Sequence, residues 1–260
     1  MTKSGRLARW ILLGESALVY LFLYAPIIIL VVFSFNSSRY AIWEGFSLDW
    51  YRAFLQDDLI LRSIKNSLIV AATATVISTF IGTLAALGMQ RFEFRGKGAL
   101  DGLFYLPVIV PEIVMAASLV IFFGSIHFTL SMSTVIIAHV AFCVSYVIIV
   151  VRARLEGFDR TLEEAAMDLG ANPFETFYRI TLPIIFPGIL SGALLAFTLS
   201  IDDYMITSFV AGVGSTTLPL QIYSMVKTRV TPEINAVSTV LLIPTIILII
   251  ISDRLQRERN

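Results

Sequence analysis

The sequence predicts an all-α integral membrane protein with six transmembrane helices, and three observations support this. The 260-residue chain is 57 % apolar and only 15 % charged, whereas soluble domains carry about 25 % charged residues. Its apolar residues form blocks of roughly 20 residues, the length that a helix needs to cross the hydrocarbon core. The charged residues are concentrated between these blocks. Such long runs without alternation are typical of helices rather than of membrane β-strands.

Six apolar segments are therefore expected to span the membrane within one transmembrane domain, residues 1–260. They cover residues 11–35, 67–89, 100–126, 133–151, 186–212 and 234–252. The basic N-terminus and the first apolar run resemble a secretory signal. That run is too long for a signal peptide, and no small-residue cleavage site follows it closely, so we expect an uncleaved first span.

Lysine and arginine residues predict the orientation of these spans. If both termini are cytoplasmic, the inner segments contain 13 of these residues and the outer segments contain 6. This positive-inside bias places both termini in the cytoplasm. Two long loops then remain, an outer one over residues 36–66 and a cytoplasmic one over residues 152–185.

The cytoplasmic loop is predicted to form a helical hairpin. Thr161 is a candidate N-cap, with Glu164 as its capping-box partner. Gly170 can provide a left-handed C-cap, and a second short helix is expected over Phe174–Thr181, ended by Pro183. By composition alone, this hairpin could simply connect two spans.

The spacing of residues in this loop indicates a more specific role. Glu-Ala-Ala, three residues, Gly, nine residues, Ile, one residue and Leu-Pro follow one another before the penultimate span. The residues are Glu164, Ala165, Ala166, Gly170, Ile180, Leu182 and Pro183. In residue types, spacing and position, the loop resembles the EAA signature of ABC-importer permeases. The resemblance implies the type I importer permease fold and a coupling helix that enters a groove of a cytoplasmic ATPase.

The resemblance also implies partners for the chain. These are a second permease subunit in a heterodimer, two copies of the ATPase and an extracytoplasmic substrate-binding protein, at the bacterial cytoplasmic (inner) membrane. The chain lacks a Gly-rich loop ending in Gly-Lys-Ser/Thr, so ATP and Mg²⁺ are expected to bind to the ATPase, and no cofactor is expected in this chain. The zero net charge does not indicate a nucleic-acid partner.

Enzymatic activity is not expected, because the sequence offers no convincing nucleophile or metal cluster. His139 and Cys143 are four residues apart, which places them on one helical face, but further ligands are missing. We therefore expect them to be polar packing residues, and no metal site is predicted. With a single cysteine, the chain cannot form an intrachain disulfide bond.

Acidic residues inside apolar segments are the candidates for a substrate path. The fifth segment carries Ser200, Asp202, Asp203 and Tyr204 near its middle. Intramembrane carboxylates are costly, and a cationic substrate would compensate them. The alternative is that these acids bond to neighbouring helices or are protonated.

Two further residues are assigned to the same path. Glu112 directly follows Pro111 in the third segment, where this proline and Pro107 are expected to break the helix beside a cavity. Trp50, in the outer loop, could hold an ammonium group by a cation–π contact or could be an interfacial anchor. In the fifth segment, small residues at positions 188, 192 and 196 predict close helix contact, for which a heterodimer interface is one use.

Three segments point to the cargo. Residues 24–38 read YAPIIILVVFSFNSS, residues 196–210 read AFTLSIDDYMITSFV, and residues 216–236 read TTLPLQIYSMVKTRVTPEINA. With these segments, the chain resembles the polyamine (spermidine/putrescine) permeases, although Pro173 stands where a polar or acidic residue can occur in that family. Related permeases carry iron(III) or aminoethylphosphonate, so those solutes stay open, as does a stand-alone secondary transporter or channel.

Overall fold

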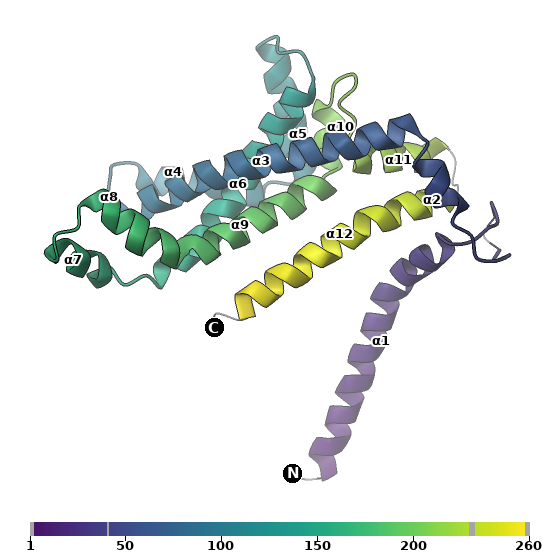
Figure 1. Cartoon of the computed structure of the whole chain (residues 1–260), viewed down its shortest axis with the longest axis horizontal. Helices are drawn as coiled ribbons and strands as arrows, with labels where there is room; N and C mark the ends of the chain where they lie inside the picture. Colours follow the sequence, from purple (N-terminus) through teal and green to yellow (C-terminus); the bar gives the residue numbers. More distant parts are fainter. Residues whose placement is uncertain (1–2, 41, 229–231, 258–260) are drawn as a thin grey trace. The chain divides into compact units, whose positions relative to one another are not determined.

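The computed structural model describes residues 3–40, 42–228 and 232–257, and the regular structure in these ranges is helical (Figure 1). The chain divides into two compact units. One contains residues 1–61 and 222–244, and the other contains residues 62–221 and 245–260. The all-α prediction is thus confirmed.

The first unit contains α1 (Lys3–Phe33), α2 (Asp49–Phe54) and the first half of α12 (Pro232–Arg257). The apolar side chains of α1 are mostly exposed; for example, Phe22 is 77 % exposed. The loop after α1 is organised by the fully buried Asn36. The side-chain amide of Asn36 donates to the carbonyl of Ile42 at 2.8 Å, and its oxygen accepts from the backbone N–H of Glu44 at 3.0 Å.

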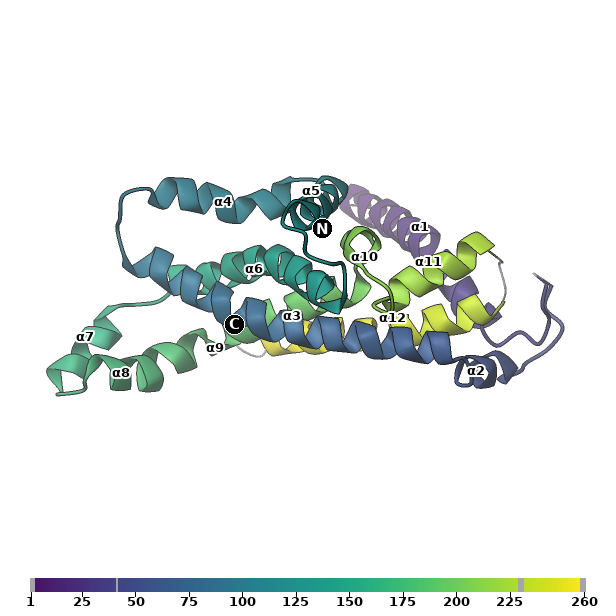
Figure 2. The ribbon, with the colours of Figure 1, turned by 90° about the horizontal axis from the view of Figure 1, so that it is seen from above.

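The core of the second unit is built on three long helices, α3 (Asp58–Arg91), α6 (Met132–Glu156) and α9 (Leu182–Asp202) (Figures 1 and 2). The middle helix is α6, whose Val147 faces both Gly82 of α3 and Gly192 of α9. A β-carbon on Gly82 would lie 2.7 Å from Val147 Cγ1, and one on Gly192 would lie 3.4 Å from it. Glycine at position 82 therefore allows α3 to approach α6 closely, whereas a β-carbon at position 192 would make an ordinary van der Waals contact.

The small residues Gly188, Gly192 and Ala196 are buried in this packing. The predicted close helix contact is confirmed, but it is made within the chain, against α6. Its use in a heterodimer interface is not needed to explain the small-residue spacing.

The third predicted segment is broken rather than straight. It consists of α4 (Lys97–Ile109) and α5 (Glu112–Ser125), which meet at an angle of 110°. In Figure 1, α5 turns away from the end of α4. Pro111 has an extended backbone between the two helices. Pro107 lies inside α4 without ending it, so only the second proline coincides with the predicted break.

The fifth predicted segment is also broken. Helix α9 ends at Asp202, and a short helix, α10 (Met205–Val210), follows after two residues. The expectation that Asp202 and Asp203 lie near the middle of a continuous span is therefore wrong, because the aspartates lie at the break. Helix α10 packs against α5, so the helices that follow the two breaks lie together.

The loop predicted over residues 152–185 starts in the last residues of α6, which ends at Glu156, and continues with α7 (Thr161–Asp168). The prediction of Thr161 as N-cap is wrong, because Thr161 is already the first helical residue. Its N–H instead donates to Asp159 Oδ1 at 2.9 Å. Gly170 has φ = 93°, which confirms the left-handed residue predicted after the helix.

The second helix of the loop does not end at Pro183. Helix α8 (Pro173–Thr176) continues through a π-helical turn, η1 (Phe177–Thr181), into α9, giving 30 continuous helical residues from Pro173 to Asp202. A proline removes one backbone donor and its ring crowds the preceding turn. The wider π turn directly before Pro183 accommodates that ring. The capping box of this helix is formed by Asn172 and Glu175.

Within the described residues, four helical stretches are long and apolar enough to cross a membrane. They are Leu12–Phe33, Asp58–Arg91, Met132–Glu156 and Pro173–Asp202. The bent α4–α5 pair would make a fifth span, and α12 contributes a shorter apolar stretch, Pro232–Ile247. The remaining helix is α11 (Leu218–Thr228).

Candidate functional site

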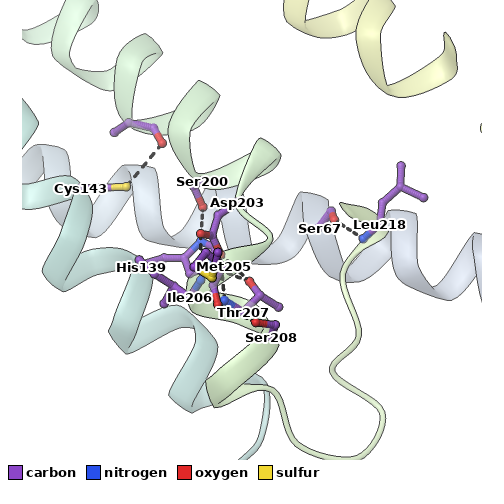
Figure 3. Close-up of polar contacts among 11 residues, drawn as sticks. Ser67, His139, Cys143, Ser200, Asp203, Met205, Ile206, Thr207, Ser208 and Leu218 are labelled. Atoms are coloured by element: carbon purple, nitrogen blue, oxygen red, sulfur yellow. Dashed lines mark hydrogen bonds and ion pairs between the residues drawn. The ribbon is translucent and has the colours of Figure 1, made fainter. Parts of the chain in front are cut away.

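A buried polar cluster lies at the break between α9 and α10 (Figure 3). Its centre is His139 of α6, which is 1 % exposed. Nδ1 of this imidazole lies 2.7 Å from Ser200 Oγ of α9, and Nε2 lies 2.9 Å from Thr207 Oγ1 of α10. One side chain thus contacts both helices that flank the break.

Asp203 completes this cluster. Its Oδ2 lies 3.2 Å from His139 Nε2, and the side chains of both residues are almost fully buried. The carboxylate also accepts hydrogen bonds from the N–H of Ile206 at 3.1 Å, the N–H of Thr207 at 2.9 Å and the hydroxyl of Thr207 at 2.8 Å. It therefore satisfies N–H groups in the first turn of α10, which lack partners within the helix.

Asp202 has different surroundings from its neighbour. Asp202 is exposed, and its Oδ1 accepts a long hydrogen bond of 3.4 Å from Thr245 Oγ1. Tyr204, on the other side of Asp203, is half-buried. The two adjacent aspartates thus differ in their surroundings. Asp203 is buried and bonded to neighbouring helices, which is the alternative expected for these acids, whereas Asp202 is exposed with one long hydrogen bond to α12.

The other predicted path residues lie on different elements. Glu112 is exposed in the first turn of α5, within electrostatic range of Tyr146 of α6. Trp50 belongs to the first unit, where its indole N–H donates to the carbonyl of Asn36 at 2.7 Å. The structure therefore brings Ser200 and Asp203 together, and places Glu112 and Trp50 outside this cluster.

The residues of the EAA pattern lie along one end of the second unit, the left end of Figure 1. Glu164 and Ala165 are exposed on α7. Apolar side chains around them are uncovered as well, with Leu169 90 % exposed and Phe174 77 % exposed. The pattern continues along the second helix of the loop, to Ile180, Leu182 and Pro183. An exposed apolar surface with charged edges is suited to protein binding.

An ion pair and two hydrogen bonds connect α7 and the residue before it to the rest of the unit. Glu163 forms an ion pair with Arg91 at the end of α3 and a hydrogen bond with Thr181 Oγ1 of η1. Next to it, Arg160 donates to the carbonyl of Gln90 at 2.6 Å. These contacts link α7 to both α3 and the helix that leads into α9.

His139 and Cys143 were expected to be polar packing residues, and both are buried with contacts to neighbouring helices. The Cys143 thiol contacts the carbonyl of Ala196 at 3.5 Å. The sequence did not indicate that His139 is a partner of Asp203. Thr207 and Glu163 gave no signal, because their roles depend on residues distant in sequence. Within the part of the chain that the structure describes, no group of three His, Cys, Asp or Glu side chains is arranged to hold a metal ion.

Comparison with known proteins gives one family. Residues 78–257 match the family described as "Binding-protein-dependent transport system inner membrane component". This match covers more than half of the chain, including the loop with the EAA pattern and both breaks.

Two curated relatives illustrate the similarity over the whole chain. The spermidine/putrescine transport system permease protein PotC of Haemophilus influenzae is 42 % identical over 243 residues, which cover 93 % of this chain and 95 % of the relative. The putrescine transport system permease protein PotI of Escherichia coli is 44 % identical over 231 residues, which cover 86 % and 82 % of the respective chains.

Among solved structures, a chain of a bacterial ABC transporter involved in the import of the acidic polysaccharide alginate has the same fold. Its TM-score is 0.79 at 18 % sequence identity, and the match covers 98 % of both chains. The ABC-importer permease fold implied by the EAA pattern is thereby confirmed.

Proposed function

The chain belongs to the family of binding-protein-dependent transport system inner membrane components, and from this we propose that it is the permease subunit of an ATP-driven importer of polyamines. The assignment of polyamines as the substrate class rests on the sequence identity of 41–44 % to permeases named for spermidine and putrescine. The exposed carboxylate of Asp202 at a helix break supports a cationic cargo, because such breaks in membrane helices line cavities.

The importer contains more subunits than this chain. A second permease pairs with it, two copies of a cytoplasmic ATPase bind ATP and Mg²⁺, and an extracytoplasmic protein delivers the solute. The uncovered apolar side chains of α7 and α8, among them Leu169 and Phe174, support docking of the ATPase at this loop. The exposed apolar faces of α1 support contact with lipid and with the second permease.

The chain crosses the bacterial inner membrane six times, with both termini in the cytoplasm. The spans are α1, α3, the bent α4–α5 pair, α6, the continuous helix ending in α9, and α12. The excess of basic residues on the inner segments supports this orientation. The chain itself is not an enzyme, and its role in each cycle is to convert movement of α7 into rearrangement of the helices around the path.

Uptake of radiolabelled spermidine and putrescine tests this function. The complete system is expressed in cells without other polyamine importers, and the Asp202→Asn/Asp203→Asn double variant is compared with the wild type. We expect uptake by the wild type and its loss in the double variant, while the complex still co-purifies with its ATPase. Asp49→Asn, which removes an exposed carboxylate in α2, is the matched control and retains uptake.

Other outcomes identify other functions. Uptake of iron(III) or aminoethylphosphonate without uptake of polyamines would contradict the polyamine assignment. Normal polyamine uptake by the double variant would contradict the role of the carboxylates in the cation path. Uptake by the purified chain in liposomes without ATP would instead indicate a stand-alone transporter.

A further inference from the structure

The imidazole of His139 contacts residues on both sides of the α9–α10 break. Both of its ring nitrogens are engaged, with Ser200 on one side of the break and with Thr207 and Asp203 on the other. All four side chains are buried. Since a buried carboxylate is stable only when it is paired and hydrogen-bonded, these contacts hold Asp203 on the side facing α6 (Figure 3).

The orientation of Asp203 constrains its neighbour. Asp202 is the last residue of α9 and Asp203 follows it with φ = −65°, which is still a helical value, so their side chains point about 100° apart around the helix axis. When Asp203 faces α6, Asp202 therefore points in another direction, which agrees with its exposure. A rotation of this short segment that exposed Asp203 would therefore move the side chain of Asp202 away from its present exposed position.

We propose that His139 is a positioning residue for transport, which retains Asp203 in the buried cluster and thereby presents the carboxylate of Asp202 to the translocated cation. This inference rests on the proposed function for the nature of the cation, but the geometry it invokes is independent of the solute. His139 touches the solute through neither ring nitrogen, because both are occupied within the chain.

The accessibility of position 202 tests the proposal directly. Cys143, the single cysteine of the chain, is replaced by alanine, and Asp202→Cys provides the only thiol of the permease. The assembled transporter, with a cysteine-free ATPase and second permease, is placed in nanodiscs and labelled with a trimethylammonium methanethiosulfonate. The labelling rate is then compared between the protein with His139 and the His139→Phe variant. Phenylalanine keeps an aromatic ring but lacks both ring nitrogens.

We expect the labelling rate to fall about tenfold in His139→Phe. Without its hydrogen-bond partner, the buried carboxylate of Asp203 is destabilised by a free energy that corresponds to about a tenfold change in an equilibrium constant. Asp203 should then turn toward water and displace position 202 from its accessible place. His139→Gln, which keeps a donor and an acceptor, should restore most of the rate. In transporters with native Asp202, spermidine uptake should also be highest with His139, nearly as high in His139→Gln and lowest in His139→Phe.

Thr134→Val is the matched control for a purely structural effect. Thr134 also lies on α6 and donates to the carbonyl of Val210 at the far end of α10, at 2.7 Å. Its replacement removes a buried α6–α10 hydrogen bond without altering the Asp203 cluster, so the labelling rate should stay unchanged even if thermal stability falls.

Three results would overturn the proposal. These are equal labelling of the His139→Phe and His139 proteins, an equal loss of labelling in Thr134→Val, and failure of His139→Gln to assemble, which would assign the histidine to folding alone. Because labelling requires no solute, an importer that carries another cargo would fail the uptake assay yet still pass this one.

Discussion

At the scale of single residues, the break between α9 and α10 places two identical side chains, those of Asp202 and Asp203, in different surroundings. Asp203 is bonded to three N–H or O–H donors of α10 and lies beside His139, whereas Asp202 is exposed. A carboxylate that stabilises a helix end and one that meets a solute should respond differently to loss of charge. The pair therefore allows folding and transport effects to be distinguished at adjacent positions.

Asp202→Asn and Asp203→Asn should have separable effects. Asp202→Asn should lower spermidine uptake about tenfold, the equivalent of 1.4 kcal/mol of lost attraction, with an unchanged melting temperature. Asp203→Asn should also destabilise the protein, by about 1–3 kcal/mol, because the buried donors around it lose their charged acceptor. Thermal unfolding of the purified complex and uptake assays measure both quantities. Equal melting temperatures for the two variants would contradict this assignment.

Asp159 controls the start of α7. The N–H of Thr161 donates to this exposed carboxylate, and the hydrogen bond lowers the pKa of Asp159 below its ordinary value of 3.8. Because the folded pKa is depressed, the stabilisation of α7 is present above pH 3.8 and is lost as the pH falls through the folded pKa. Asp159→Ala should speed amide hydrogen exchange in the first turn of α7 several-fold, because the first N–H of the helix loses its acceptor. Asp159→Asn retains an acceptor and should exchange nearly as slowly as the wild type.

The sequence identified Asp202 and Asp203 as functional candidates for a general physical reason, the cost of acids in an apolar segment. It could not assign different surroundings to them. That division depends on His139, which is far away in sequence, and on a helix break that composition does not reveal. Residues such as Asp203 are recognised as structural only when their partners are known.

At the scale of helices, α9 packs on α6 with glycine at positions 188 and 192, and only the first of these leaves no room for a β-carbon. A β-carbon on Gly188 would lie 2.7 Å from Arg154 Cβ, whereas one on Gly192 would lie at least 3.4 Å from its neighbours on α6. Gly188→Ala should therefore destabilise the protein by about 1–3 kcal/mol, the cost of overpacking. Gly192→Ala should be nearly neutral. Thermal unfolding of both variants measures the difference, and equal stabilities would contradict the close approach at Gly188.

The ion pair between Glu163 of α7 and Arg91 of α3 connects the loop to a long helix, so that movement of the loop can be transmitted through it. Glu163 connects Arg91 of α3 with Thr181 of η1, and both charged residues are partly shielded from water. Arg91→Glu or Glu163→Arg should reduce the solute transported per ATP hydrolysed, while the ATPase still co-purifies. The double exchange should recover part of that loss, with a coupling free energy of at least about 0.5 kcal/mol. Additive single effects would show that the ion pair has no part in coupling.

The helices themselves were predictable to different degrees. Uninterrupted apolar runs predicted α3 and α6, because lipid requires every backbone group to be satisfied within the helix. The continuity from α8 into α9 was not predictable, since Pro183 ordinarily ends a helix and the π turn that accommodates it has no clear sequence signal. The capping box of the loop was expected at Thr161 but occurs at Asn172, because Thr161 is already inside α7 and its N–H donates to Asp159 instead.

At the scale of the whole molecule, the two broken segments have a common feature. Each break is followed by a short helix, and these two helices, α5 and α10, pack against each other. Glu112 begins one of them, and the aspartate pair precedes the other. Irregular backbone within membrane segments occurs where it is buried in protein or lines a cavity. The polar groups of the proposed path are therefore located at the breaks rather than along regular helices.

The orientation of the chain in the membrane can be tested with single thiols in the Cys143→Ala background. Gln56, after α2, and Asp168, at the end of α7, are both exposed and belong to loops assigned to opposite sides. Because basic residues favour the cytoplasmic side, a membrane-impermeant thiol reagent should label Gln56→Cys in intact cells. It should label Asp168→Cys only after the inner membrane is opened. Labelling of both variants in intact cells would contradict the six-span topology, since it would place the proposed coupling loop on the side opposite to ATP.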